Sequence, residues 1–572
     1  MHLNQRPAIR SERGFSMFIV LMALTVTAMF VAASFAAVNG DLPQSATAKN
    51  RKSTYAAAEA GLAFYLNHLQ QDPDYWTLCD KAPDPNASER SPINLQWDGA
   101  GNDPRTWRTV PGTTAQYTIE LLETKNYPNG CVTTDQKSII DESTGTFKVR
   151  FTGRPSPSSS MHRSIVATFR RDSFLNFVYF TEFEDIDPNA LSDSTARATA
   201  LSKCAEKYRT ARASTTANGC PYGNEITFPD GDKVNGPLHT NDESLMTCGT
   251  PTFGRDKTIG GATMSPKTDT IEVRGPLPGY AGRQSVTQGS RSYTGCSTNP
   301  TINTPTGKFT PNAKYLQMPQ SNQKLAEVAQ SNGTYYTGKT IIRLNNTTMD
   351  VTNYAANGTS TTRTGVAWPN NGVLYVDNAG TCSGEYPTDA NYDEAAACGN
   401  VYVSGTYAKS LTIASRNDII VKPTIGAKLN NNSTDSDLKG ASDATLGLIA
   451  DNFIRVGHRV ATDSSGDCDN YAPTNEPTVL NVRIEAAILS LKHSFIADNY
   501  NCGKLGTLTI VGAIAQRYRG TVSTFSGTTI VTGFTKNYWY DDRFRYRSPP
   551  YFLSPLDSAW DVVRVHEQVP AR

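Results

Sequence analysis

The sequence predicts a mainly β protein with a long N-terminal α-helix. Phe15 to Val38 contains no charged side chain, and at about 1.5 Å per residue it would form roughly 36 Å of helix. Beyond Ser173, many short apolar runs alternate with Gly, Asn, Asp and Pro, which is typical of short strands joined by turns. Residues 411–421 and 446–456 repeat one design of strand, polar turn and strand. Such repetition predicts a right-handed β-solenoid, with β-sandwich domains as the alternative.

The N-terminal helix is expected to continue as a stalk through 49–71, which is rich in helix formers and apolar on one side. Pro43 predicts a bend or break, because an interior proline removes a backbone hydrogen bond. The apolar run is long enough for a hydrocarbon core of about 30 Å, which predicts a single-pass anchor with a cytoplasmic N-terminus and an extracytoplasmic C-terminal part. A plain signal anchor and a signal peptide cut after Ala36 are the alternatives.

The start of this helix resembles the class III signal of type IV pilins and pseudopilins. A polar leader ends in Gly14, Phe15 follows, and the apolar helix begins at once. The resemblance implies cleavage after Gly14 by a prepilin peptidase, methylation of Phe15, and a helix that contacts other pilins and membrane lipid. Ile19 holds the fifth position after the cut, where most major pilins have Glu. This departure favours a minor pilin or a pseudopilin-like component.

Strand-like runs at 115–122, 146–154 and 163–171 follow the stalk. A long helix followed by a small antiparallel sheet is the layout of a pilin head, and residues 14–171 resemble PilX-like minor pilins. The region beyond resembles β-helical surface domains attached to such N-termini. The expected organisation is a leader over 1–14, a helix and stalk over 15–72, a pilin-like head over 73–171, a β-solenoid over 172–535 and a C-terminal aromatic/Arg cap over 536–572.

Composition favours an exported protein. Net charge is +1 and no long basic run is present, so nucleic-acid binding is not expected. The ten cysteines include no CxxC pair, which gives no zinc spacing and fits disulfides, with buried free thiols as the alternative. Connectivity cannot be fixed from sequence, and the simplest pairing joins Cys79 to Cys131, Cys204 to Cys220, Cys248 to Cys296, Cys382 to Cys398 and Cys468 to Cys502.

Two polar clusters invite a chemical interpretation. His239 stands beside Asn241, Asp242 and Glu243, which could bind a metal or perform acid–base work, or could form a turn that caps backbone groups. The turn is favoured because no second His accompanies it. A second cluster resembles half a calcium loop but lacks a bidentate Glu at position twelve; it comprises Asp463, Asp467 and Asp469. No other cofactor, no metal site and no catalytic residue is expected.

Near the C-terminus, arginines interleave with aromatic residues, and two interpretations stand. The block could form a ligand surface through cation–π and stacking contacts, or it could cap the open edge of the last strands. The candidate ligand residues are Arg517, Arg519, Tyr538, Trp539, Arg543 and Tyr546.

The predicted function is therefore that of a minor pilin or pseudopilin-like surface protein. It would act in pilus assembly, or in adhesion to host or environmental glycans or proteins. A β-helix enzyme acting on polysaccharides is the alternative of a different class, and a surface structural protein unrelated to pili is the third. Catalysis is not expected, because no GxSxG, phosphate loop, HExxH or pair of groove carboxylates stands out.

Overall fold

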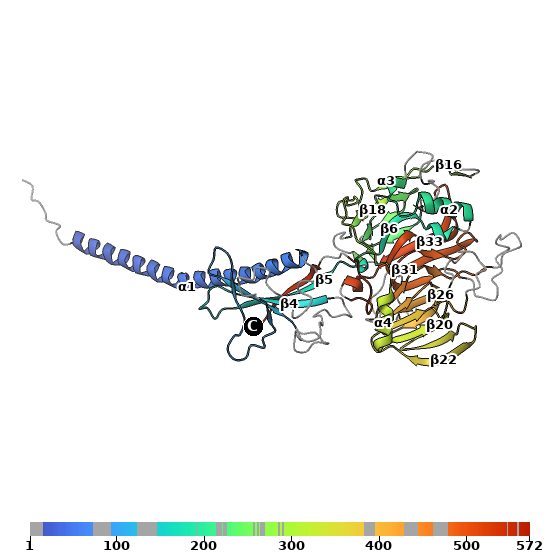
Figure 1. Ribbon diagram of the computed structural model, residues 1–572. Helices are drawn as coiled ribbons and strands as arrows, with labels where there is room; N and C mark the ends of the chain where they lie inside the picture. Colours follow the sequence, from blue (N-terminus) through green and yellow to red (C-terminus); the bar gives the residue numbers. More distant parts are fainter. Residues whose placement is uncertain are drawn as a thin grey trace, which may run out of the picture. The chain divides into compact units, whose positions relative to one another are not determined.

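A computed structural model describes residues 15–71, 93–122, 146–191, 193–212, 220, 226–255, 258–259, 262–263, 269–283, 286–288, 291–293, 295–382, 395–427, 444–460, 479–545, 547–556 and 560–572. The prediction of a mainly β chain with a long N-terminal helix is confirmed (Figure 1). The chain divides into two compact units. Unit 1 comprises Met1–Ile140, Phe147–Arg170 and Trp560–Arg572, and unit 2 comprises Asp141–Thr146 and Arg171–Ala559.

Helix α1 of unit 1 spans Phe15–Gln71, and it runs through Pro43 instead of breaking there. A single proline removes one backbone hydrogen bond, and helical turns continue on both sides of it. The predicted single-pass membrane segment is wrong: a bilayer needs about 20 mostly apolar residues in one helix, and no helix in the described ranges combines that length with that apolar character. The predicted contact with membrane lipid and the cytoplasmic placement of the N-terminus depended on that segment.

The sheet of unit 1 packs against the C-terminal half of α1. Its order is β1-β3-β4-β5-β34, and β2 also pairs with β3. Tyr65 of α1 lies at the centre of the core, where its ring centroid is 5.3–6.3 Å from those of Phe147, Phe151 and Phe169. The strands are β1 (Ile93–Leu95), β2 (Arg108–Thr109), β3 (Gln116–Leu121), β4 (Thr146–Arg154), β5 (Arg163–Arg171) and β34 (Trp560–Gln568).

Glycine allows the close approach of this helix to this sheet. A Cβ on Gly153 of β4 would collide with the carbonyl oxygen of Thr54 and would lie 2.7 Å from the nitrogen of Ala58, both on α1. A Cβ on Gly61 of α1 would lie 2.9 Å from the Tyr117 ring. The stalk predicted from helix propensity is therefore also one layer of a packed α/β unit.

The C-terminal cap expected over 536–572 divides between the two units. Strand β33 (Thr529–Tyr540) belongs to the main sheet of unit 2, whereas β34 is an edge strand of unit 1 beside β5. Trp560 at the start of β34 is only 1% exposed and meets Phe147 edge-on, with ring centroids 4.6 Å apart. Burial of this indole in the core of unit 1 explains why β34 belongs to that unit.

Unit 2 contains columns of parallel strands, and in the central part of each column a strand pairs with the one two places further along the chain. The first column consists of β19 (Thr334–Thr337), β23 (Val373–Asp377), β25 (Leu411–Ser415), β27 (Leu446–Ala450), β29 (Arg483–Ser490) and β31 (Lys504–Arg519), followed by β6 (Tyr179–Ile186), β9 (Leu238–Thr240) and β14 (Ile271–Val273). The second consists of β20 (Thr340–Asn346), β24 (Val401–Tyr407), β26 (Ile419–Ala427), β28 (Ile454–Val456) and β30 (Phe495–Ala497).

The core of unit 2 follows from this register. Ile413, Leu448, Ile488, Ile514 and Tyr179 are successive cross-strand partners, and all are buried in one apolar cluster. The neighbouring ladder of Ala414, Ile449, Leu489, Ala515 and Phe180 is buried in a second cluster on the other face, together with apolar residues of α4 (Gln323–Asn332). Burial on both faces explains why these strands read as continuous apolar runs.

The two segments that repeat one design in the sequence are stacked neighbours. Leu411 pairs with Leu446, and Ile419 pairs with Ile454. Asp418 and Arg455 form a fully buried ion pair at 3.0 Å between them. The backbone N–H of Asn452 donates to the carbonyl of Asn417 at 3.2 Å, so the turn positions of the repeat stack as well as the strands.

Further elements of unit 2 extend these columns or form smaller separate sheets. Parallel strands are β7 (Thr227–Phe228), β8 (Lys233–Asn235), β10 (Leu245–Thr247), β11 (Thr252–Phe253), β15 (Tyr280–Gly282) and β18 (Thr301–Ile302). Antiparallel strands are β12 (Thr258–Ile259), β13 (Ala262–Thr263), β16 (Val286–Gln288), β17 (Arg291–Tyr293), β21 (Thr348–Tyr354), β22 (Ser360–Ala367) and β32 (Ser523–Ser526). Short helices are η1 (Phe174–Asn176), η2 (Pro188–Ala190), α2 (Ser194–Lys203), α3 (Arg209–Arg212) and η4 (Asp542–Arg545).

Candidate functional site

The predicted processing site lies at the start of α1. Gly14 is outside the described residues, and Phe15 is the first residue of the helix. The backbone at Val38 and Pro43 is helical, and their side chains are outside the described part. Ile19 lies within the described N-terminal half, where its side chain is exposed. The residues that the sequence assigned to filament packing therefore share one uninterrupted helix.

We call Met17–Val31 the apolar helix segment. Its large apolar side chains are between 48% and 71% exposed on every side of the helix; they are Met17, Phe18, Ile19, Val20, Leu21, Met22, Leu24, Val26, Met29, Phe30 and Val31. By contrast, Ala58, Tyr65 and Leu69 further along α1 are buried against the sheet. Figure 1 shows the N-terminal half of α1 extending beyond the sheet of unit 1. This segment offers a surface for helix packing along its whole circumference.

The His239 cluster is built into the interior of unit 2. His239 is 1% exposed, with Nδ1 3.0 Å from Glu272 Oε2 and Nε2 3.3 Å from Asn241 Oδ1. Its ring stacks on Phe180 at 5.6 Å. The amide of Asn241 donates to the carbonyl of Leu316 and accepts from its N–H. The ring nitrogens of His239 and the amide of Asn241 therefore all have partners within the protein, as expected for a turn that caps backbone groups.

Asp242 of the same cluster binds backbone and guanidinium donors. It accepts from the backbone N–H groups of Glu184 and Arg209 at 2.8 Å and from Arg212 Nη1 at 2.7 Å. Glu243 accepts from the backbone N–H of Thr210 at 2.6 Å. The two carboxylates thus hold the loop and helix around 207–212 against β9.

Two of the residues predicted to form a ligand surface lie in the interior. Arg519 is buried, with Nη1 3.1 Å from Glu184 Oε2 and its guanidinium 3.5 Å above the Phe228 ring. Tyr538 is buried as well. Burial raises the pKa of Glu184, and Arg519 opposes that shift. Neither Arg519 nor Tyr538 is accessible to a ligand.

The other residues of this predicted surface lie near the periphery. Arg517 pairs with Glu206 at 2.7 Å, and the Trp539 indole donates to Asn537 at 2.9 Å. Arg543 pairs with Asp541 at 2.7 Å, and Tyr546 lies outside the described residues. Sequence reasoning missed the acidic partners, of which Glu182 and Glu184 alternate on β6 as Arg517 and Arg519 alternate on β31. This matching alternation of acidic and basic residues is the sequence pattern that could have indicated the pairing of the two strands.

A further buried pair joins β33 to the turn before β8. Lys536 Nζ lies 2.7 Å from Asp232 Oδ2, and both side chains are buried. Burial raises the pKa of Asp232 and lowers that of Lys536, while their mutual attraction opposes both shifts. The pair fixes β33 beside β8.

Disulfides join three of the expected pairs among the cysteines that the structure describes: Cys204–Cys220, Cys248–Cys296 and Cys382–Cys398. Cys502 is disulfide-bonded, and its expected partner Cys468 lies outside the described residues, as do Cys79 and Cys131. The calcium candidates Asp463, Asp467 and Asp469 also lie outside them. Asp185 lies close to Cys204 and Cys220, but the disulfide uses both sulfur atoms.

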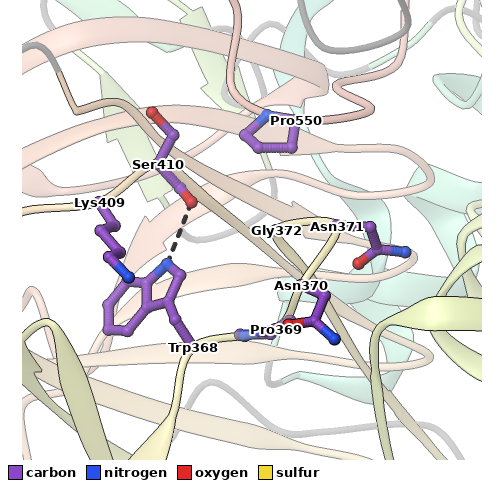
Figure 2. Close-up of a pocket in the computed structure, with 8 residues that line it drawn as sticks. All are labelled: Trp368, Pro369, Asn370, Asn371, Gly372, Lys409, Ser410 and Pro550. Atoms are coloured by element: carbon purple, nitrogen blue, oxygen red, sulfur yellow. Dashed lines mark hydrogen bonds between the residues drawn. The ribbon is translucent and has the colours of Figure 1, made fainter. Parts of the chain in front are cut away.

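One pocket of unit 2 combines residue types suited to ligand binding. Its volume is about 320 Å³, and its walls come from the turn between β22 and β23, the turn between β24 and β25, and the loop after η4. Figure 2 shows the lining residues: Trp368, Pro369, Asn370, Asn371, Gly372, Lys409, Ser410 and Pro550. We call this the Trp368 pocket.

The frame of the Trp368 pocket is fixed by hydrogen bonds. The indole Nε1–H of Trp368 donates to the carbonyl of Ser410 at 3.1 Å. Asn371 accepts from the N–H of Val373 and donates to the carbonyl of Val328, both at 3.0 Å. The sequence Trp-Pro-Asn-Asn-Gly was a turn signal, but nothing local to it indicated the residues from the other two segments.

Neither a protein-family model nor a curated protein matches this chain. Among solved structures, the competence-associated pilin ComZ from Thermus thermophilus aligns with a TM-score of 0.26 and 10% sequence identity, covering 91% of this chain and 98% of that one. A TM-score of this size carries no argument about the fold or the function of this protein.

Proposed function

We propose that this protein is a pilin-like subunit, a minor pilin or pseudopilin, that joins a filament through the apolar helix segment. Unit 2 is then the part that it presents for pilus assembly or adhesion. The proposal rests on the exposure of that segment, and the Gly14–Phe15 junction supports it.

Exposure of the apolar helix segment is unfavourable for a chain on its own. Leaving a large apolar side chain in water instead of burying it costs about 1.5–3 kcal/mol. A helix that is apolar all round is normally buried among other elements. The occupant that we propose is a set of apolar helices of the same kind from other pilin subunits, because the segment begins directly after the pilin-like junction.

Within this proposal, unit 2 is a right-handed β-solenoid. The parallel, in-register pairing of alternate strands supports this architecture, because each coil of a solenoid stacks its strands on those of the next. The β-sandwich alternative requires mainly antiparallel sheets. An experimental structure of unit 2 in which the coils fail to wind about one axis would contradict this proposal.

The polysaccharide-active enzyme remains the alternative function. It requires a pair of carboxylates in a groove. The residues that line the Trp368 pocket include no carboxylate. This pocket is therefore better suited to binding than to glycoside hydrolysis.

The first experiment is mass spectrometry of the mature N-terminus in cells that carry a prepilin peptidase. Cleavage after Gly14 with a methylated Phe15 is expected. An intact N-terminus that begins with Met1 would contradict the pilin-like role.

The second experiment tests the helix surface. Met22→Asp with Met29→Asp places two carboxylates in the apolar helix segment, and we expect the double variant to be lost from filaments sheared from cells. Gln70→Asp is the matched control, because it adds charge to an exposed position of α1 outside the segment. Equal recovery of the double variant and the control in filaments would contradict packing through this surface.

A further inference from the structure

We propose that Asp232 and Lys536 condense to an intramolecular amide cross-link, a covalent modification within unit 2. Lys536 Nζ lies 2.7 Å from Asp232 Oδ2, and both side chains are buried. The two residues are 304 positions apart, so the bond would tie an early part of the unit to one of its last strands. The cross-link goes beyond the proposed filament role and does not depend on it, because both residues belong to unit 2.

Lys536 occupies an interior position of β33. At alternate positions of the same strand, Phe534, Tyr538 and Tyr540 are all buried. The amine lies 5.7 Å from the centre of the Phe228 ring. A lysine is almost never buried in this way without a partner. The pair is therefore enclosed largely by aromatic side chains, and little water reaches it.

The backbone holds the Asp232 carboxyl group against the amine. Its Oδ1 accepts a hydrogen bond from the backbone N–H of Lys536 at 2.9 Å, while Oδ2 contacts Nζ. In the parallel pairing of β33 with β8, Asn537 is opposite Lys233, so the residues that precede these two are also neighbours. Because a C–O bond is about 1.2 Å long, Asp232 Cγ is at most about 3.9 Å from Nζ, near the approach of about 3–3.5 Å that favours reaction.

Burial favours both the reactive forms and the product. It raises the pKa of Asp232 and lowers that of Lys536, although their mutual attraction opposes both shifts. The neutral acid and the neutral amine are the forms that condense. Keeping two charges in the interior is unfavourable even when they are paired. An amide carries no charge, so its formation removes that cost.

The step is a condensation without oxidation or reduction. Lys536 first transfers a proton to the Asp232 carboxylate, which gives an amine and a carboxylic acid. The lone pair of the amine attacks Cγ and forms the C–N bond. A second proton passes from the nitrogen to the departing oxygen, the C–O bond breaks, and one water molecule leaves.

Arg519 can assist this step through its charge. Its Nη2 is buried and has no hydrogen-bond partner among the described residues. The guanidinium charge acts on both reacting groups, since it lowers the pKa of Asp232 and that of Lys536. A positive charge at this place would stabilise the negative oxygen that develops when the amine attacks Cγ.

The test is peptide mapping of the full-length protein by mass spectrometry, after reduction and alkylation of its cysteines and digestion with trypsin. Trypsin does not cleave after a lysine whose amine is acylated. The cross-link would therefore join peptide 213–233 to an uncleaved peptide 520–543. We expect this product to be lighter than the sum of its two peptides by one water molecule, with fragment ions that place the bond on Asp232 and Lys536.

Lys492 provides the internal control. Its Nζ lies 3.2 Å from Asp451 Oδ2, but its side chain is 44% exposed, so this pair should stay unlinked. Lys536→Arg keeps the positive charge without a nucleophilic amine and should abolish the linked product, whereas Lys492→Arg should leave it unchanged. Circular dichroism checks the fold of both variants.

The unaltered protein decides the outcome even if Lys536→Arg fails to fold. Recovery of peptides 213–233 and 520–536 as separate species of unchanged mass would overturn the proposal. Equal linkage of Lys492 to Asp451 would also overturn it, because burial would then not be the cause of the reaction.

Discussion

His458 gives unit 2 a predictable dependence on pH. Its side chain is buried, and burial lowers its pKa from the usual value. The folded state therefore binds fewer protons than the unfolded state near the ordinary histidine pKa of about 6.5. The stability from neutral His458 is present above that pKa and is lost as pH falls through the lowered pKa of the folded state.

We expect His458→Gln to reduce the loss of stability between pH 7 and pH 5. Urea unfolding at both pH values, monitored by far-UV circular dichroism, measures the difference. The raised pKa values of buried carboxyls such as Glu184 and Asp232 contribute with the opposite sign, but they are common to both proteins. If the variant lost as much stability between pH 7 and pH 5 as the unaltered protein, His458 would not titrate as its burial requires.

Gly372 is required at its position for two separable reasons. It has a positive φ, and a side chain would collide with Pro550. We expect Gly372→Ala to destabilise unit 2 by about 1–3 kcal/mol. Gly307→Ala is the control, because Gly307 has φ +67° with nothing within 4 Å of an added Cβ. Denaturant unfolding of both variants separates backbone strain from the steric contact. Equal losses of unfolding free energy in the two variants would mean that Pro550 moves freely.

At the scale of elements, β34 matters to unit 1 because of one side chain. Trp560 packs in the same core as Tyr65 and Phe147, although the strand is at the sheet edge. Trp560→Ala should lower the stability of unit 1 by about 3–5 kcal/mol through loss of burial and creation of a cavity. His566→Ala on the exposed part of the same strand should change it little. Calorimetric unfolding measures the stability of both variants. Similar losses of stability in the two variants would contradict this role of the indole.

Elements also show where local sequence patterns succeed. The strand-like runs at 115–122, 146–154 and 163–171 correspond to β3, β4 and β5, and the repeat at 411–421 and 446–456 forms stacked strands. Alternation and repetition are local properties, so they can be read directly. Helix α1 does not break at Pro43, because the neighbouring turns outweigh the loss of one hydrogen bond, and the bend expected there stays a prediction.

At the scale of the whole molecule, the chain of unit 2 is inserted between two neighbouring strands of unit 1, β5 and β34. Unit 1 therefore completes its sheet only when the last residues of the chain are available. Contacts so distant in sequence form late, because the entropy of closing a long loop must be overcome first.

A chain truncated after Ala559 tests this arrangement. We expect faster amide hydrogen exchange in β4 and β5, because β5 loses its edge partner and the core loses Trp560. Exchange in the columns of unit 2 should stay the same, since their strands pair within that unit. Mass spectrometry of peptic fragments provides the measurement. Unchanged protection of β5 would contradict a role for β34 in holding unit 1 together.

The sequence by itself determined the long N-terminal helix and the mainly β character of the rest, because these depend on composition and periodicity. The simplest local pairing of cysteines includes Cys204–Cys220, and the structure contains that disulfide. Tertiary structure alone decided that Arg519 and Tyr538 are buried, that Trp560 returns to unit 1, and that 368–372, 409–410 and 550 meet in one pocket. Burial and proximity depend on how distant strands pair. Parallel pairing joins strands through long connections, and no local pattern specifies which strands become neighbours.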